Sequence, residues 1–270
     1  LGAMVRSINP DGTLRLTTIG GNMFTTLDGE YCKIHTRSGK VYSGTILSTS
    51  PAIHVFEDAK TLTRKEDTMM VRLDEVVFKE EDTKALGIET GDFISVEPKF
   101  TVTDSGFVKS RYLDDKGSTA CVFALLEYWR RTGTKPRCRT LFVLSTYEEV
   151  GHGGASIPAW VNEAIAFDMG CVGADLAGHE TKVSICPKDS GGPYDYGMTS
   201  RLIALAKEHE LDYAVDIFPM YGSDAEAALS AGWDIKAALV GPGVGASHGM
   251  ERTHVKGLEN ATKLVWAYLA

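Results

Sequence analysis

Residues 140–154 read Thr-Leu-Phe-Val-Leu-Ser-Thr-Tyr-Glu-Glu-Val-Gly-His-Gly-Gly, an apolar run followed by two adjacent carboxylates and a glycine-rich turn. A continuous apolar run of this kind is typical of a strand buried on both faces of a sheet, and we expect a strand at 140–146. Predicted helices and strands alternate around it, with helices at 118–131, 196–209, 224–231 and 257–270 and strands at 163–169, 183–186, 213–218 and 236–240. Such alternation predicts an α/β fold whose sheet is covered by helices on both faces.

The first part of the chain follows another pattern, in which turn signals separate short alternating segments. Asn9-Pro10-Asp11-Gly12 and Arg37-Ser38-Gly39-Lys40 are breaks of this kind. Strands are expected at 4–8, 13–18, 31–36, 41–47, 69–73 and 93–97. Several short strands in succession suggest a small barrel or sandwich. Because the pattern changes at Pro98, we expect a β-rich domain over residues 1–98 and an α/β layered domain over residues 99–270.

Composition excludes several classes of function. Lys and Arg number 28 and Asp and Glu 36, so the formal net charge is 28 − 36 = −8, which argues against nucleic acid as a partner. No apolar run of about 18 residues occurs, and no basic segment with an apolar run opens the sequence, so we expect neither a membrane span nor a secretory signal. The five cysteines form no Cys-x-x-Cys pair, which favours the reducing cytoplasm over a disulfide framework.

Carboxylates and a histidine lie at the ends of predicted elements. Asp114 precedes a helix, Glu148 and Glu149 follow the apolar run, Asp168 ends a strand, and His248 lies just beyond another strand. Ligands of open α/β sheets bind at the carboxyl ends of strands, and Asp, Glu and His are the ligands that borderline divalent metals accept. Each residue alone also fits a helix cap, a charged loop or a turn. Together they predict a metal site, with Glu148 as the base.

These segments resemble a known family. Tyr147-Glu-Glu-Val-Gly-His-Gly-Gly-Ala155 is similar to the Glu-Glu-Val-Gly-x-x-Gly-Ala block of the tetrahedral-type metallo-aminopeptidases, which include glutamyl, leucyl and lysyl aminopeptidases with two metal ions. Ser110-Arg-Tyr-Leu-Asp-Asp-Lys-Gly117 resembles the family's Leu-Asp-Asp/Asn-Arg-x-Gly block. Further similar segments lie at residues 1–21, 188–193 and 222–225. The resemblance implies an α/β/α layered catalytic domain carrying a mostly β, barrel-like inserted domain.

The resemblance also implies a ligand set for two divalent ions, zinc or cobalt. Asp114 would bridge the two ions, Glu149 and His248 would hold one, and Asp168 would hold the other. Two ions held in this way polarise a scissile carbonyl and activate a water molecule.

The implied activity is removal of N-terminal residues from peptides. Glu148 would act as the general base that takes a proton from the attacking water and passes it to the leaving amine. Asp224 would contact the substrate's terminus. The family assembles into dimers and larger shells, so self-association is implied as well.

The sequence also departs from the family. A histidine of a His-x-Asp motif, a further ligand that the family places just ahead of the segment matching Leu1, does not occur in these 270 residues. We therefore expect the sequence to start inside a domain, and the chain as given to lack one ligand. The family often has Tyr-Ile-His-Ser where this chain has Ala246-Ser-His-Gly, which leaves Glu251 and His254 as alternatives to His248. His152 is expected to be a loop residue.

Two other functions remain open. A non-catalytic relative would keep the fold without the chemistry, as the missing histidine allows. A glycoside hydrolase would use paired carboxylates roughly 5–9.5 Å apart. Sugar sites usually add exposed tryptophans, whereas Trp129 and Trp266 fall in predicted helices and are expected in the core.

Overall fold

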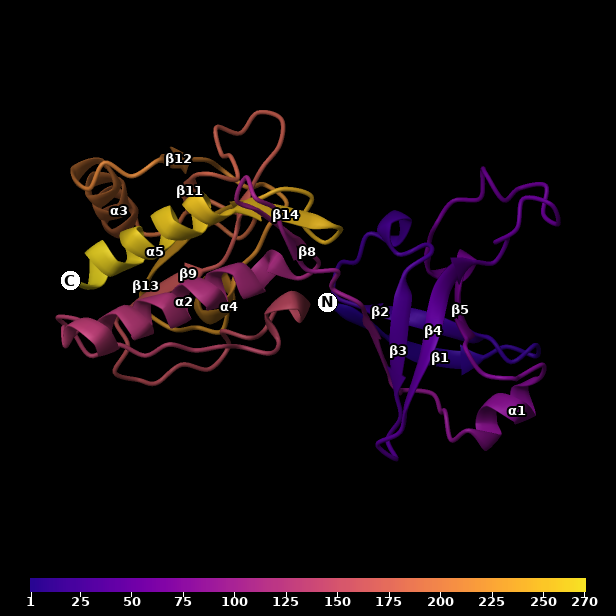
Figure 1. Ribbon diagram of the computed structural model, residues 1–270. Coiled ribbons are helices and arrows are strands. Elements are labelled where there is room, and N and C mark those ends of the chain that lie inside the picture. The colour runs from indigo at the N-terminus through magenta and orange to yellow at the C-terminus, as the bar shows by residue number, and fades with distance from the viewer. The chain divides into compact units, whose positions relative to one another are not determined.

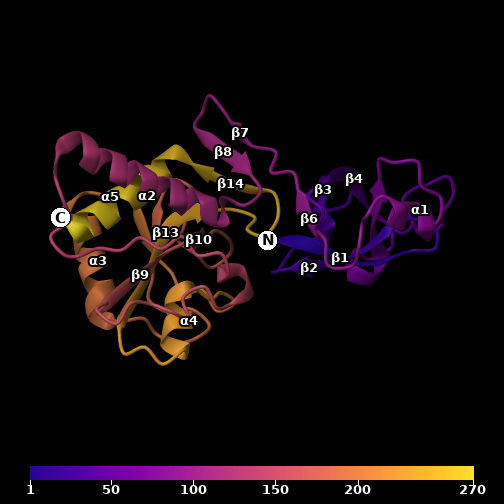
Figure 2. The ribbon, with the colours of Figure 1, turned by 90° about the horizontal axis from the view of Figure 1, so that it is seen from below.

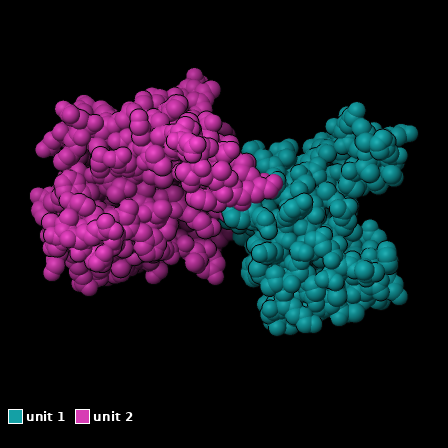
Figure 3. Space-filling view, in the orientation of Figure 1, with its two compact units in different colours: residues 1–98 teal, residues 99–270 magenta.

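The computed structural model describes all 270 residues. The chain divides into two compact units, Leu1–Pro98 and Lys99–Ala270, which Figure 3 colours teal and magenta.

The first unit is a closed barrel. Its strands are β1 (Gly2–Ile8), β2 (Leu14–Ile19), β3 (Tyr31–His35), β4 (Val41–Ser48), β5 (Met69–Leu73) and β6 (Phe93–Val96). They run in the order β1-β2-β5-β4-β3-β6, and β6 closes the barrel by pairing antiparallel with β1. Figure 1 labels β1 to β5 of this unit. The helical turns are η1 (Phe24–Thr26), η2 (Glu66–Thr68) and α1 (Glu80–Ala85). Alternate side chains such as Leu14, Leu16, Ile34 and Ile46 fill the interior, as the period of two along a strand requires.

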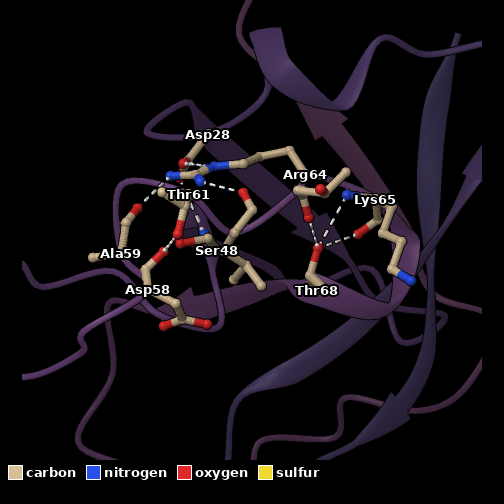
Figure 4. Close-up of polar contacts among 10 residues, drawn as sticks. Asp28, Ser48, Asp58, Ala59, Thr61, Arg64, Lys65 and Thr68 are labelled. Atoms are coloured by element: carbon tan, nitrogen blue, oxygen red, sulfur yellow. Dashed lines mark hydrogen bonds and ion pairs between the residues drawn. The ribbon is translucent and has the colours of Figure 1, made fainter.

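A long loop between β4 and β5 is fastened to the barrel by Arg64. Its guanidinium Nε lies 2.9 Å from Asp28 Oδ2, and its Nη2 donates to the carbonyl of Ala59 over 3.1 Å (Figure 4). The other oxygen of Asp28 accepts the backbone N–H of Ser48 at the end of β4. One arginine therefore ties the loop to the barrel.

The second unit is built on a mixed sheet with the order β10-β13-β11-β12, in which β9 also pairs with β13. The strands are β9 (Glu163–Phe167), β10 (Gly170–Cys171), β11 (Val183–Cys186), β12 (Tyr213–Val215) and β13 (Lys236–Val244). β13 lies parallel to β9 and β10 and antiparallel to β11. Because β13 touches three partners, it forms the centre of this sheet.

Helices cover both faces of the sheet, as Figure 2 shows. They are α2 (Leu113–Thr132), α3 (Tyr196–Glu208), α4 (Asp224–Ser230) and α5 (Val255–Leu269). Ala238 and Val240 of β13 pack with α2, α3 and α5, whereas Ala237 and Leu239 pack on the opposite side with Ala225 of α4. The predicted α/β/α layering with a barrel-like β module is confirmed. None of the helices combines the length and hydrophobicity needed to cross a membrane.

A smaller sheet leads into helices α2 and α5. It has the order β14-β8-β7, with β7 (Thr101–Val102), β8 (Phe107–Ser110) and β14 (Glu251–His254) all antiparallel to their neighbours. The chain passes from β8 into α2 and from β14 into α5, so this sheet brings the starts of the two helices together. Sequence reasoning did not predict these strands.

The strand expected at 140–146 is absent, and this prediction was wrong. Residues 139–145 form neither helix nor strand, and Leu141, Val143 and Leu144 are 48%, 61% and 53% exposed. An apolar run becomes a strand only where a neighbouring strand completes its hydrogen bonds. No β-ladder includes this segment, so its backbone stays outside the sheet.

Candidate active site

Asp114 lies in a distorted turn at the start of α2. Asp114 and Asp115 have non-helical backbone angles, and the peptide bond between them is cis. The side chain of Asp114 is only 7% exposed, and its backbone N–H donates to Glu251. The helix thus begins with a kink that turns a buried carboxylate away from the usual helical position.

Glu148 and Glu149 lie on the short helical turn η3 (Glu148–Val150). This turn, and not an extended strand, is what allows two successive carboxylates to serve one site. The glycines that follow permit close packing, because a Cβ on Gly154 would stand 1.9 Å from the carbonyl oxygen of Asp224. The turn consequently lies against the first residue of α4.

His248 completes a cluster with Asp114 and Glu149. It lies in the turn between β13 and β14, and its backbone is left-handed with φ of 63°. Its Nε2 is 3.4 Å from Asp114 Oδ2 and 3.5 Å from Glu149 Oε2. One ligand atom from each of the three residues lies within 4.8 Å of the other two.

Two more carboxyl groups, those of Asp168 and Asp115, interact electrostatically with Asp114. Asp168 follows β9 and is 6% exposed, and its Oδ1 accepts the N–H of Met169 over 2.7 Å. Burial first, and then repulsion from Asp115 and Asp114, raises the pKa of Asp168 well above its usual range. Burial and the charge of Asp114 likewise raise the pKa of Asp115. Such crowding of acidic groups is the environment that a bound cation relieves.

Glu148 and Asp224 lie near these acidic side chains. Burial, then the charges of Glu149, Asp114 and Asp224, raises the pKa of Glu148 to about 7. A carboxyl group with a pKa near neutrality is suited to accept and then release a proton. One oxygen of Asp224, Oδ1, is buried without a hydrogen-bond partner.

The structure also separates the three histidines that the sequence left in question. His254 is engaged elsewhere, since its Nε2 is 2.8 Å from the carbonyl of Ser105 and its Nδ1 accepts the N–H of Lys256. His152 stacks on the ring of Tyr147 with a centroid distance of 4.8 Å. Of the three, only His248 belongs to the cluster with Asp114 and Glu149.

Sequence reasoning missed two residues here. Glu251, considered only as a ligand, instead accepts the backbone N–H groups of Asp114 and His248. Tyr221 donates its hydroxyl to the carbonyl of Met169, and burial followed by the charge of Asp168 raises the pKa of Tyr221 well above its usual range. Tyr221 directly precedes the segment at 222–225 that the motif comparison singled out, so its neighbour in sequence was the available signal.

The donor set fits a divalent cation. Two ligands at about 2.0–2.1 Å from a tetrahedral zinc ion lie about 3.3–3.4 Å apart. The distances from His248 Nε2 to the oxygens of Asp114 and Glu149, 3.4 and 3.5 Å, are close to that spacing. Two carboxylates and one imidazole leave a fourth position open, which is the pattern of a catalytic site and not of a closed structural one.

A layered α/β/α fold that brings two carboxylates and an imidazole together has the donor set that metal-dependent hydrolases use. The sequence profile of the M42 glutamyl aminopeptidase family matches residues 1–264, and the chain belongs to this family. It is therefore a peptide hydrolase of the aminopeptidase class, as predicted, and the glycoside hydrolase alternative is set aside.

Similar proteins span the whole chain. It is 46% identical over 270 residues to YhfE of Bacillus subtilis (strain 168), covering 100% of this chain and 78% of YhfE. A TET aminopeptidase from the marine sediment archaeon Thaumarchaeota archaeon SCGC AB-539-E09 has a TM-score of 0.85 at 19% identity, covering 99% and 78% of the two chains. The TET1 peptidase of Pyrococcus horikoshii has a TM-score of 0.83 at 21% identity, covering 99% and 80%, and assembles into a tetrahedron or a large octahedral shell.

Proposed function

We propose that Asp114, Glu149 and His248 bind one divalent metal ion, and that Asp114 shares a second ion with Asp168. The observation that carries this proposal is the approach of the three donor atoms to within 4.8 Å of one another. Zinc or cobalt suits a mixed set of carboxylates and imidazole. Bound there, such ions supply Lewis-acid polarisation of the scissile carbonyl and lower the pKa of water.

We further propose that Glu148 is the general base. Its carboxylate takes a proton from the attacking water and gives that proton to the departing amine. The raised pKa of Glu148, to about 7, supports both steps, because a much stronger acid would be a poor base. The charges of Glu149 and Asp114 both act on Glu148, so the proton acceptor lies close to two of the proposed metal ligands.

Asp224 supplies the preference for a free N-terminus in this proposal. A protonated α-amino group would find a buried, unpartnered carboxylate oxygen in Asp224 Oδ1. The charge of Asp224 helps to raise the pKa of Glu148, which supports an amino-group site close to the proton acceptor. Attraction of this kind selects exopeptidase cleavage, because an internal peptide nitrogen carries no charge.

The decisive variant is Glu148→Gln. It removes the proton acceptor and keeps the three metal donors, so hydrolysis of an aminoacyl p-nitroanilide should fall by about 10²–10⁴-fold. Metal content after dialysis against Zn²⁺ or Co²⁺, measured by atomic absorption, should be unchanged.

A matched control is Glu259→Gln on α5, which makes the same chemical change at an exposed carboxylate paired with Lys263. It should retain full activity. Full activity in Glu148→Gln would contradict the role of the base, and a wild-type protein that binds no metal would contradict the site and support a non-catalytic relative.

We also propose self-association and a cytoplasmic location. The Pyrococcus horikoshii TET1 peptidase assembles into shells, which supports association of this chain with its own copies. All five cysteines are free, which suits a reducing compartment. A single-chain mass in sedimentation experiments would count against the first proposal, and fractionation of cells tests the second.

A further inference from the structure

One buried carboxylate outside the proposed ligand set joins the two loops that carry the ligands. Glu251 is 1% exposed and begins β14, where it pairs across the ladder with Ser110 at the end of β8. Asp114 follows β8 by four residues, and His248 precedes Glu251 by three. The side chain therefore lies between the turn of Asp114 and the turn of His248.

The two oxygens of Glu251 divide their hydrogen bonds between these turns. Oε2 accepts the backbone N–H of Asp114 over 3.0 Å, and Oε1 accepts the backbone N–H of His248 over 2.9 Å. Asp114 and Glu251 are 137 positions apart in the chain, so the contact fixes two distant segments against each other.

The turn of His248 needs such support. Ala246 and His248 both have left-handed backbones, with φ of 57° and 63°, a conformation that residues other than glycine avoid. The turn is closed at its base by the paired Gly245 and Arg252, whose N–H groups and carbonyls bond to each other. Within the turn, the hydrogen bond to Glu251 holds the backbone at the residue whose imidazole faces Asp114 and Glu149.

We propose that Glu251 is a positioning residue that sets the distance between the two metal-binding turns through its paired hydrogen bonds. This inference rests on the metal site proposed above. It assigns to Glu251 no contact with metal or substrate, only the placement of Asp114 and His248.

The chemistry of the side chain makes the idea testable. A carboxylate offers two acceptor oxygens, whereas a glutamine amide offers one oxygen and an NH₂ group that can only donate. In Glu251→Gln, one of the two backbone N–H groups would face a donor. The turn that loses its partner would shift, although the side chain keeps its size.

The experiment is a titration of the purified metal-free protein with Co²⁺ alone, followed by its visible absorption spectrum and dissociation constant. Glu251→Gln should bind Co²⁺ about 10–100-fold more weakly, with a changed absorption spectrum, as expected when a group that orients metal ligands is altered. The matched control is Thr253→Val, a buried residue of the same strand whose hydroxyl donates to the carbonyl of Gly243. Thr253→Val should lower the thermal midpoint of unfolding by about as much as Glu251→Gln does. It should leave the Co²⁺ spectrum and the affinity for Co²⁺ unchanged.

Each other result overturns a specific claim. If the wild-type protein does not bind Co²⁺, the proposed metal site fails. If the wild type binds and Glu251→Gln binds equally well with the same spectrum, only the positioning role of Glu251 fails. Glu251→Asp is the second variant, since it keeps both oxygens but draws them back by about 1.5 Å, one carbon–carbon bond. Glu251→Asp should also weaken Co²⁺ binding. The positioning role of Glu251 is overturned if Glu251→Asp binds Co²⁺ with wild-type affinity, or if neither variant folds.

Discussion

Two adjacent glycines decide how closely the Glu148–Glu149 turn approaches α4. A Cβ on Gly153 would stand 2.2 Å from the hydroxyl of Ser145, and one on Gly154 would stand 1.9 Å from the carbonyl oxygen of Asp224. Neither distance is possible for real atoms, and the backbone oxygen cannot rotate away. The lack of a side chain at these positions therefore fixes the placement of the turn.

Gly154→Ala should destabilise the second unit and disturb the site. The added methyl group forces the turn away from α4, and overpacking of this kind costs about 1–3 kcal/mol. Urea unfolding followed by circular dichroism measures the loss, and aminopeptidase activity should fall with it. Gly173→Ala is the control, because nothing lies within 4 Å of its Cβ position, and it should change the stability by less than about 0.5 kcal/mol. Equal effects of the two variants would refute the packing argument.

A single buried thiol makes the barrel sensitive to alkali. Burial, and then the charge of Asp74, raises the pKa of Cys32 from 9.0 to about 12. The unfolded chain ionises this thiol near pH 9 and the folded chain does not. The contribution of Cys32 to stability is thus complete below pH 9 and is lost as the pH rises through 12.

Replacement by Cys32→Ala should flatten this part of the pH dependence. Between pH 9 and 11 the free energy of unfolding of the wild type should fall faster than that of the variant, by up to about 1.4 kcal/mol per pH unit. Urea titrations at pH 8, 9.5 and 10.5 give the comparison. Parallel pH dependences would show that the thiol stays protonated in both states or ionises equally in both.

At the scale of elements, one guanidinium group links the loop between β4 and β5 to the barrel. Arg64 bonds to Asp28 on the barrel and to the carbonyl of Ala59 within the loop. Ile53 and Val55 of this loop are 57% and 72% exposed, so apolar packing does little to hold it. Polar contacts therefore set the path of the loop: those of Arg64, and the turns in which the N–H groups of Phe56 and Leu62 donate to the carbonyls of Ala52 and Asp58.

Arg64→Ala should release the loop while the barrel persists. The loss of hydrogen bonds to a charged group predicts a destabilisation of about 1–3 kcal/mol and faster cleavage by subtilisin between residues 50 and 63. Mass spectrometry of the fragments locates the cut. Lys60→Ala, which changes an exposed cation of the same loop, should be cleaved at the wild-type rate. Cleavage of Arg64→Ala at the wild-type rate would mean that the loop is ordered by something else.

Elements that are defined by neighbours in sequence were predictable. The turn Asn9–Gly12 and the alternation on either side of it indicate β1 and β2, and the same reasoning works for the helical period of α5. The segment at 140–146 has the composition of a buried strand but no partner in a ladder, and composition does not report a partner.

In the site, too, some features could be predicted from the sequence and others could not. The adjacency of Glu148 and Glu149 and their glycine-rich sequel are visible in the sequence. Their helical turn is not visible there, and only the fold brings the backbone N–H of Asp114 to donate to Glu251, 137 positions away. Sequence reasoning therefore named the proposed ligands and base and missed Glu251, whose hydrogen bonds link two of their turns.

For the whole molecule, the two units have separate hydrophobic cores. Every residue of the barrel core lies between Ala3 and Val96, and the cores of the second unit begin beyond Pro98. A unit that contains its own core can in principle fold alone. We propose on this basis that residues 1–98 and 99–270 are independent domains.

A fragment of residues 1–98 should therefore unfold cooperatively in urea. Within it, Ile46→Ala should cost about 2–4 kcal/mol, because Ile46 is 0% exposed. Val41→Ala on the same strand, 53% exposed, should cost well under 1 kcal/mol. A fragment without a cooperative transition would contradict the proposed independence.

Closure of the barrel has a consequence for how this protein can vary. Because β1 pairs with β6 antiparallel, with Ala3 opposite Ile94, the chain enters and leaves the barrel on adjacent strands about 4.8 Å apart. Lengthening, shortening or exchanging the barrel's outer loops leaves that gap unchanged. The outer loops of the barrel can thus change while the end of β6, from which the chain continues to the second unit, stays next to the start of β1.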